Sequence, residues 1–362
     1  MNAPDQHLAG ETDVLLQEIT QQPGTFLESS TGLGAQTEVL EEMASKIRDS
    51  AQPVVLTGMG SSLDACQAAA SMLGRLGVPV LSINTAELAH FRVASLRPGT
   101  CVIAVSQSGL SAEVVRLAES LSAVPEVWLA GITNGLDNPL AERARVTLDM
   151  RAGHEVGPAT KTFTATMVAL HALCAMLPGR RTAREVTDEA AVLGQRAMEV
   201  AQTQLAEPYG HGADIAQRVG DAPHLVLLGR GVGRAAAEVG ALVLKEASRT
   251  ACECMDAAEF RHGPLELAGP TLAAILVSLE PTTIELDRRL LHDLASRGGR
   301  VLAIGQADPG SAVDRLVLPP VAPLLDVALA SLPLQLLAWH RARHSEGAPG
   351  EFLIGSKVTT LE

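Results

Sequence analysis

The chain has 362 residues, of which 47% are hydrophobic and 2% aromatic, and its formal net charge is −13. This length predicts two or three domains with sizeable cores. The acidic balance excludes a nucleic-acid or membrane-surface partner, because neither gains electrostatically from a negative protein. With so few aromatic rings to stack on, ligand recognition has to rest on backbone and small polar groups.

The polar N-terminal residues show no signal segment, and no apolar run is as long as a membrane span, which predicts a cytoplasmic protein. The cysteines lie in apolar surroundings without metal-ligand spacing, which favours reduced structural thiols. We therefore expect no metal site and no cofactor. The five cysteines are Cys66, Cys101, Cys174, Cys252 and Cys254.

The first fifty residues predict a helical extension rather than a domain. Met1 to Thr12 are polar and lack periodicity, so we expect disorder. The apolar spacing after Asp13 predicts a short amphipathic helix that ends before Pro23, followed by another turn or two. Thr37 to Arg48 predicts a further helix that packs on the first domain.

From Val54 to about Leu177, strand and helix patterns alternate, which predicts a parallel sheet with helices on both faces. The expected strands are Val54 to Gly58, Val78 to Asn84, Thr100 to Ser106, Glu126 to Thr133 and Val146 to Met150. The expected helices are Leu63 to Leu76, Ala112 to Leu121 and Phe163 to Met176. A polar stretch, Pro178 to Glu189, marks a boundary. Helices over Ala190 to Leu205 and Ala213 to Val219 precede a second alternation that begins at Leu225.

The second half repeats the first. Val102–Ser106 aligns with Ala274–Ser278 at an offset of 172 residues, and Gly58-Met59-Gly60 aligns with Gly229-Arg230-Gly231 at 171. Separated elements that keep nearly the same offset indicate a duplicated domain. We predict an α/β fold with two tandem domains, each a flavodoxin-like three-layer sandwich around a parallel sheet of about five strands. The expected boundaries are an extension at 1–50, domains at 51–180 and 181–345, and a tail at 346–362.

Two strand-to-helix junctions in the first half favour phosphate. One is Gly58-Met59-Gly60-Ser61-Ser62 and the other is Ser106-Gln107-Ser108-Gly109. Unpaired N–H groups at a helix start attract anions, and the carboxyl ends of parallel strands meet at one edge of the sheet. The alternative is that Ser111 is merely an N-cap. The second half has Ser278-Leu279-Glu280-Pro281 instead, where the glutamate opposes an anion, so we expect one phosphorylated ligand per chain.

These motifs resemble tandem SIS (sugar isomerase) domains, most closely the isomerase half of glucosamine-6-phosphate synthase, the glutamine:fructose-6-phosphate aminotransferase. The likeness extends over nearly the whole chain. Besides the two junctions it rests on Leu244-Lys245-Glu246, Glu259-Phe260-Arg261-His262-Gly263-Pro264-Leu265 and the terminal Lys357-Val358-Thr359-Thr360-Leu361-Glu362.

The resemblance implies roles for individual residues. Glu246 is the expected proton shuttle, His262 opens the sugar ring in the site of a neighbouring subunit of a homodimer, and Lys357 forms an imine with the open sugar. Glu87, Glu155 and Lys161 also match the family, and we expect Thr160 to have a positioning rather than a catalytic role. The expected binding residues are Ser62, Ser106, Gln107, Ser108, Ser111, Pro158, Thr160 and Ser356.

Each catalytic candidate has an ordinary structural alternative: a solvated Lys-Glu pair in a helix, a turn histidine before Gly-Pro, and an exposed terminal lysine. The chemistry nevertheless suits aldose–ketose interconversion, which needs ring opening, a carboxylate proton shuttle and an amine that forms imines.

The chain departs from the synthase in its tail and at Val243, where the synthase has lysine, and we expect it to act without a glutaminase domain. The sequence therefore predicts a deaminase/isomerase that converts glucosamine 6-phosphate to fructose 6-phosphate and ammonia. The alternatives are a fructosamine-6-phosphate deglycase, an ammonia-dependent aminotransferase and a sugar-phosphate sensor without turnover.

Overall fold

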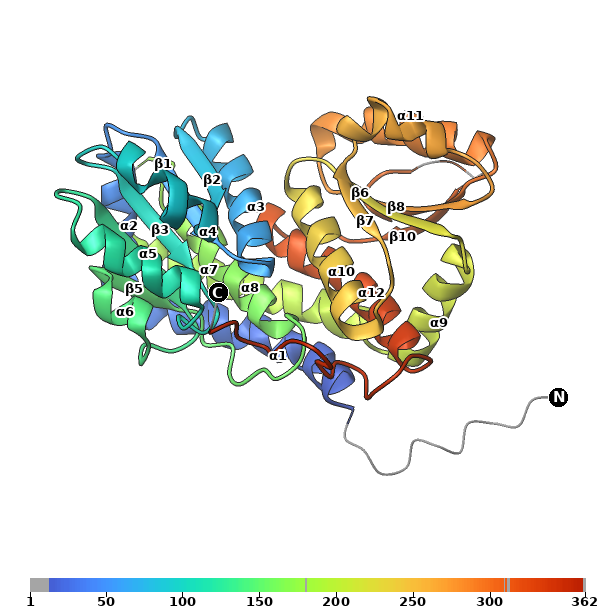
Figure 1. Ribbon diagram of the computed structural model, residues 1–362, viewed down its shortest axis with the longest axis horizontal. Helices are drawn as coiled ribbons and strands as arrows, with labels where there is room; N and C mark the ends of the chain where they lie inside the picture. The colour runs from blue at the N-terminus through green and yellow to red at the C-terminus, as the bar shows by residue number, and fades with distance from the viewer. Residues whose placement is uncertain (1–12, 180, 309, 311–312, 361–362) are drawn as a thin grey trace.

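Two parallel five-stranded sheets form the centres of two similar halves (Figure 1). The computed structural model describes residues 13–179, 181–308, 310 and 313–360, so the segment Met1 to Thr12, for which we predicted disorder, lies outside the described residues. The first sheet has the order β2-β1-β3-β4-β5 and the second the order β7-β6-β8-β9-β10. The same order in both confirms the predicted α/β fold and its duplication.

All strand pairs in both sheets are parallel. The first sheet consists of β1 (Val54–Gly58), β2 (Val80–Asn84), β3 (Cys101–Val105), β4 (Trp128–Thr133) and β5 (Val146–Asp149). The second consists of β6 (His224–Gly229), β7 (Glu253–Asp256), β8 (Leu272–Ser278), β9 (Arg300–Gly305) and β10 (Asp314–Val317). Strands β1, β3 and β8 are buried along their whole length, as their unbroken apolar runs predict for a sheet covered on both faces.

Helices surround the sheets and fill the space between them (Figure 1). Those up to residue 179 are α1 (Val14–Gly32), α2 (Thr37–Arg48), α3 (Ser61–Arg75), α4 (Thr85–Glu87), α5 (Ala112–Ser122), α6 (Pro139–Arg143) and α7 (Lys161–Ala175). Those after it are α8 (Ala183–Gln204), α9 (Pro208–Val219), α10 (Val232–Ser248), α11 (Ile284–Ser296) and α12 (Pro323–Ala342). Helix α3 packs on α7 and α10, and α12 packs on α7 and α10. One contiguous apolar core therefore runs through both halves.

The predicted helix end before Pro23 is wrong, because α1 continues through this proline to Gly32. A proline inside a helix leaves the carbonyl four residues earlier without its donor. Here that carbonyl belongs to Ile19, and Nε2 of Gln22 donates to it at 3.2 Å. Gln22 is fully buried and also bonds Gln335 of α12 at 2.6 Å. Tertiary contacts therefore stabilise α1 beyond Pro23, where local propensity predicts that the helix ends.

The helix predicted over Ala190 to Leu205 begins earlier, at Ala183. Thr182 and Glu185 form a reciprocal capping box there, in which each side chain accepts from the other's backbone N–H. The polar stretch that we interpreted as a boundary therefore contains a helix start. None of the helices in the described part of the chain is long and apolar enough to cross a membrane.

Candidate active site

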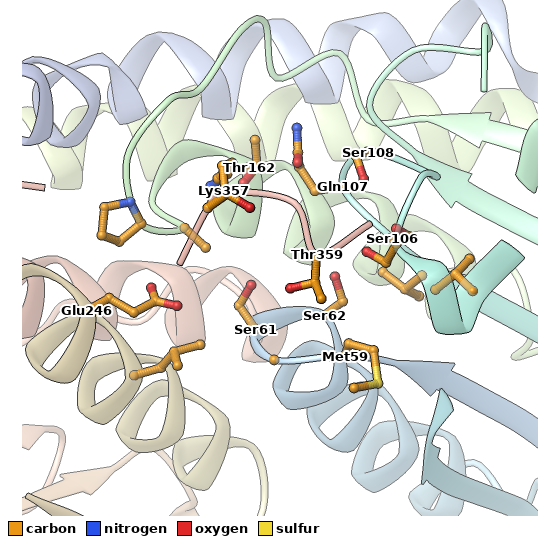
Figure 2. Close-up of a pocket in the computed structure, with 18 of the residues that line it drawn as sticks. Met59, Ser61, Ser62, Ser106, Gln107, Ser108, Thr162, Glu246, Lys357 and Thr359 are labelled. Carbon is orange, nitrogen blue, oxygen red and sulfur yellow. The ribbon is translucent and has the colours of Figure 1, made fainter. Parts of the chain in front are cut away.

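A cavity of about 280 Å³ lies where β1 and β3 end (Figure 2). These strands are neighbours, and the strand order of the sheet changes direction between them, which opens a crevice in folds of this kind. Helix α10 of the second half, the loop that leads into α7 and the C-terminal tail supply the remaining walls. Nearly all the predicted binding and catalytic residues line it: Ser62, Ser106, Gln107, Ser108, Ser111, Pro158, Glu246, Ser356 and Lys357.

The turn after β3 is ordered by its own hydroxyl groups. Oγ of Ser106 accepts from the Gly109 N–H and Oγ of Ser108 from the Leu110 N–H, each at 3.1 Å. Gly109 has φ +65°, and a Cβ there would meet Oδ1 of Asn138 at 1.9 Å. Only glycine fits this position, so the turn holds its two serines in a fixed orientation.

Ser111 occupies the N-cap of α5, but within the described residues its side chain makes no capping hydrogen bond. The alternative interpretation of Ser111 as a simple cap is therefore not supported. The N–H of Ala112, the first residue of α5, donates instead to the carbonyl of Thr359 in the tail at 3.0 Å. This contact fastens the tail to the mouth of the cavity.

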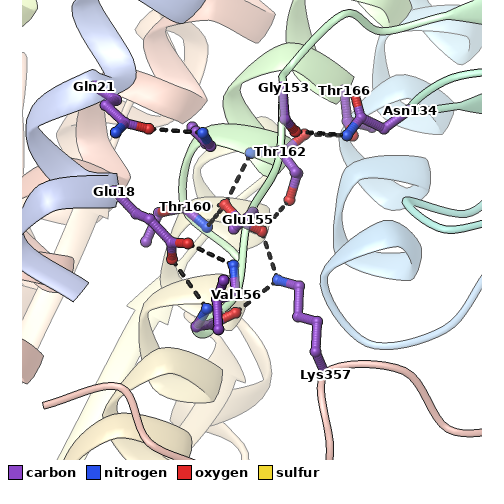
Figure 3. Close-up of polar contacts among 12 residues, drawn as sticks. Glu18, Gln21, Asn134, Gly153, Glu155, Val156, Thr160, Thr162, Thr166 and Lys357 are labelled. Carbon is purple, nitrogen blue, oxygen red and sulfur yellow. Dashed lines mark hydrogen bonds and ion pairs between the residues drawn. The ribbon is translucent and has the colours of Figure 1, made fainter. Parts of the chain in front are cut away.

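The tail brings Lys357 into the site (Figure 3). Its Nζ donates to Oε2 of Glu155 at 2.5 Å and to the carbonyl of Gly157 at 2.7 Å, and its side chain is 19% exposed. The alternative of a solvent-exposed terminal lysine is thus wrong. The ammonium is held on one side of the cavity by an anion and a carbonyl.

Glu155 is a buried carboxylate whose oxygens accept from several donors of its own loop. Thr160 donates to it through its N–H at 2.9 Å and through Oγ1 at 3.0 Å, and Thr162 does so at 3.1 and 2.5 Å. Thr160 is fully buried and turned toward Glu155, whereas Thr162 lines the cavity. Thr160 therefore orients the Glu155 carboxylate, which binds Lys357. The threonine that lines the cavity is Thr162 and not the predicted Thr160.

The N-terminal helix fixes the same loop. Glu18 of α1 accepts from the N–H groups of Val156 at 2.5 Å and Gly157 at 3.0 Å. Burial raises the pKa of Glu18, and these backbone donors oppose that shift. Lys161, another family match, is buried and donates to Gln21 of α1 at 2.6 Å. The extension that we expected only to pack thus positions the loop that receives Lys357.

Glu246 faces the cavity from α10, on the side opposite the loop that holds Lys357 (Figure 2). Burial raises its pKa to about 7, the charge of Lys357 opposes this shift and that of Glu155 adds to it. A carboxyl group with this pKa takes up and returns a proton near neutral pH with little cost in either direction.

His262 lies outside this cavity. It follows the short 3₁₀ turn Glu259–Arg261 and lines a different pocket together with Arg230 and Arg261. One chain therefore does not bring His262 to Glu246, as expected if a neighbouring subunit provides it. Glu87, also a family match, pairs with Arg92 at 2.9 Å.

The cysteines are all free. Burial raises the pKa of the thiols of Cys101, Cys174 and Cys254 to about 12, which leaves them unreactive at neutral pH. In the described ranges, no three histidine, cysteine or acidic side chains are grouped in a way that could hold a metal ion.

Residues 46–176 and 220–316 of the chain match the SIS domain family. The glutamine–fructose-6-phosphate aminotransferase (isomerizing) of Aeropyrum pernix is 30% identical over 358 residues, which cover 92% of this chain and 55% of the relative. That of Halobacterium salinarum is 29% identical over 350 residues, covering 94% and 58%. The chain thus spans about half the length of the curated relatives it matches.

Solved structures share the fold. The C-terminal domain of glucosamine-fructose-6-phosphate aminotransferase from Francisella tularensis has a TM-score of 0.83 at 22% identity, covering 94% of this chain and 99% of that one. Tagatose-6-phosphate ketose/aldose isomerase from Escherichia coli has 0.77 at 23%, covering 94% and 96%. Glucosamine-6-phosphate deaminase from Thermotoga maritima has 0.71 at 20%, covering 95% and 98%.

Proposed function

Because the chain belongs to the SIS domain family, we propose that it is an enzyme that isomerises and deaminates an amino-sugar 6-phosphate. Glucosamine 6-phosphate and water give fructose 6-phosphate and ammonia. The observation that carries this proposal is the position of Lys357, which the tail brings into the cavity that Glu246 and the serine turns also line. A site that only binds sugar phosphate needs neither an enclosed amine nor a carboxyl group with a pKa near 7.

The serine turns bind the phosphate of the substrate. Helices α3 and α5 both begin at the cavity, so their positive ends and first N–H groups favour a dianion there. The hydroxyls of Ser62, Ser108 and Ser111 add neutral donors. With the phosphate at these turns, C1 and C2 of the sugar extend toward Lys357 and Glu246.

Glu246 moves the proton that isomerisation requires. In the open-chain aldose its carboxylate removes the proton from C2, and the resulting carboxylic acid returns it to C1. One proton of the amine moves to O1, so the aldehyde has become an alcohol and the C2–N bond an imine. The pKa of Glu246, about 7, makes both proton transfers feasible at neutral pH.

Lys357 then displaces the amine. Its neutral Nζ attacks C2 of the imine, ammonia leaves, and water hydrolyses the new imine to fructose 6-phosphate and free Lys357. The ammonium has to lose a proton before it attacks, and Oε2 of Glu155 lies 2.5 Å away to receive it. Glu155 thus positions the lysine and accepts its proton.

We further propose that the enzyme is a homodimer in which His262 of one chain opens the sugar ring in the site of the other. This arrangement accounts for a histidine that lies apart from Glu246 within its own chain. The five free cysteines suit a cytoplasmic location.

Incubation with glucosamine 6-phosphate, followed by assays of ammonia and fructose 6-phosphate, tests the proposal. Equal amounts of both products are expected from the parent and the Lys46→Ala control, which changes an exposed lysine of α2, and almost none from Lys357→Ala. Amine release from a fructosamine 6-phosphate but not from glucosamine 6-phosphate would identify a deglycase. Synthesis from fructose 6-phosphate and ammonia alone would identify an aminotransferase. Thermal stabilisation by sugar phosphate that survives Lys357→Ala, with no turnover of any of these, would identify a sensor.

A further inference from the structure

Helices α3 and α10 are counterparts in the duplicated fold, and they pack against each other. Each follows a glycine with the same unusual backbone: Gly60 has φ 52° and ψ −132°, and Gly231 has φ 51° and ψ −127°. Counting 171 residues onward from the first helix places Arg75 at the position of Glu246. Glu246 lines the cavity of the first half, so Arg75 is expected at the corresponding place in the second.

Arg75 does reach that place, where it forms an ion pair with Glu280. Glu280 follows β8 and is the counterpart of Ser108 at the offset of 172. Its carboxylate also accepts from the N–H of Val232, the first residue of α10, at 2.8 Å. The Glu280 side chain is 4% exposed. A carboxylate of the protein thus sits at the helix start that corresponds to the proposed phosphate position in the first half.

The fit around this carboxylate is close. A Cβ at Gly231 would meet Oε1 of Glu280 at 2.3 Å, so glycine is required for the approach. Beside it, Asp287 of α11 accepts from Nε of Arg230 at 2.8 Å and from Oγ of Ser278 at 2.7 Å. Internal pairs therefore occupy the side chains of Glu280, Arg230 and Ser278 at this turn of the second half.

We propose that the second half contains a closed anion site, in which the carboxylate of Glu280 is the built-in ligand and Arg75 its cation. It rests on the proposed function only in treating the corresponding turn of the first half as a phosphate site. Glu280 also joins two elements of that site. It holds the end of α3, whose start carries Ser62, and the start of α10, whose end carries Glu246.

The test is whether removing the carboxylate opens the site to inorganic phosphate. Glu280→Ser introduces the residue found at its counterpart, and Glu119→Ser is the matched control, since Glu119 pairs with Arg143 on the surface. Thermal midpoints are measured with increasing phosphate and with chloride at equal ionic strength. We expect Glu280→Ser to lower the midpoint by about 4 °C or more, and phosphate to restore it by more than it raises the parent or the control.

Arg75→Ala in the Glu280→Ser background should abolish the extra response to phosphate. The proposal is overturned if phosphate raises the midpoints of Glu280→Ser and the parent equally. If Glu280→Ser does not fold, Glu280→Gln and Arg75→Gln provide a second test through their double mutant. A closed pair predicts that the two losses are not additive, and additive losses overturn it. These measurements need no turnover, whereas the stabilisation of the parent by glucosamine 6-phosphate reports separately on the first-half site.

Discussion

Nζ of Lys357 lies 2.5 Å from Oε2 of Glu155, although 202 residues separate them in the sequence. The carboxylate is buried and oriented by Thr160 and Thr162 within its own loop. The lysine lies on a tail without regular secondary structure, which Ala112 fastens at Thr359. This pair therefore links the C-terminal tail of the chain to a loop of the first half.

Replacing Glu155 by glutamine should slow imine formation. The variant keeps the size of the side chain but loses the charge that holds the ammonium and the base that takes its proton. We expect kcat to fall about tenfold to a hundredfold with a smaller change in KM, and borohydride to trap the substrate more slowly. Glu351→Gln, a tail glutamate outside the cavity, is the control. Unchanged trapping in Glu155→Gln would remove Glu155 from the mechanism.

The activity should rise with pH through about 7, because Glu246 has to be ionised to remove the first proton. Glu246→Gln should lower kcat by about a hundredfold or more at every pH. pH profiles of kcat for the parent and for Glu246→Gln measure both effects, and Glu113→Asp, at another glutamate that lines the cavity, is the control. A flat profile across this range would contradict the assignment.

Glu246 should also make the stability of the folded protein depend on pH. Its pKa of about 7 in the folded protein lies above the ordinary value of 4.5, so the stability that the protonated form provides is complete below pH 4.5 and is lost as the pH rises through 7. Glu246→Gln should therefore raise the thermal midpoint by about 2–4 °C above pH 7 and by less near pH 4.5. A difference that does not change with pH would argue against a buried charge at this position.

Subunit complementation tests the proposed role of His262. Glu246→Gln and His262→Ala should each be almost inactive. After the two variants are mixed, unfolded and refolded together, half of the dimers are mixed, and each mixed dimer has one complete site if His262 acts across the interface. About a quarter of the parental activity should return. No recovery, with dimers confirmed by light scattering, would place His262 in the site of its own chain or outside the reaction.

Ser108→Glu copies the closed second half into the open first half. The new carboxylate lies at the start of the proposed phosphate site, so sugar phosphate should lose its stabilising effect and KM should rise at least about tenfold. Ser120→Glu, at a partly exposed position of α5 that does not line the cavity, is the control. Equal KM values for both variants would mean that phosphate does not bind at this turn.

Much of the fold follows from local pattern. Strand β1 and helix α2 have the predicted bounds, because unbroken apolar runs and helical spacing are local signals. Helix α8 begins earlier than predicted, at Ala183, and the larger departure is α1, where Pro23 suggests an end that the buried Gln22 prevents. Such a contact depends on packing against a helix more than 300 residues away and leaves no local signal.

Site residues that belong to a sequence motif could be predicted. Those that depend on a contact between distant segments could not. Ser62, Ser106 and Glu246 lie in motifs and line the cavity. Glu18 was missed, because its bonds to Val156 and Gly157 span 138 and 139 residues and a lone glutamate on a helix gives no indication of such a partner. A family match pointed to Glu155, but its contact with Lys357 required the folded tail.

The most direct test of the central claim is peptide mass analysis after borohydride reduction in the presence of glucosamine 6-phosphate. Reduction of an imine between Lys357 and the ketose attaches a hexitol phosphate to the peptide that contains this lysine. The account predicts this adduct on Lys357, its loss in Lys357→Ala, and no comparable adduct on Lys46 or Lys245. Ammonia release without any adduct on Lys357, or an adduct on another lysine, would contradict it.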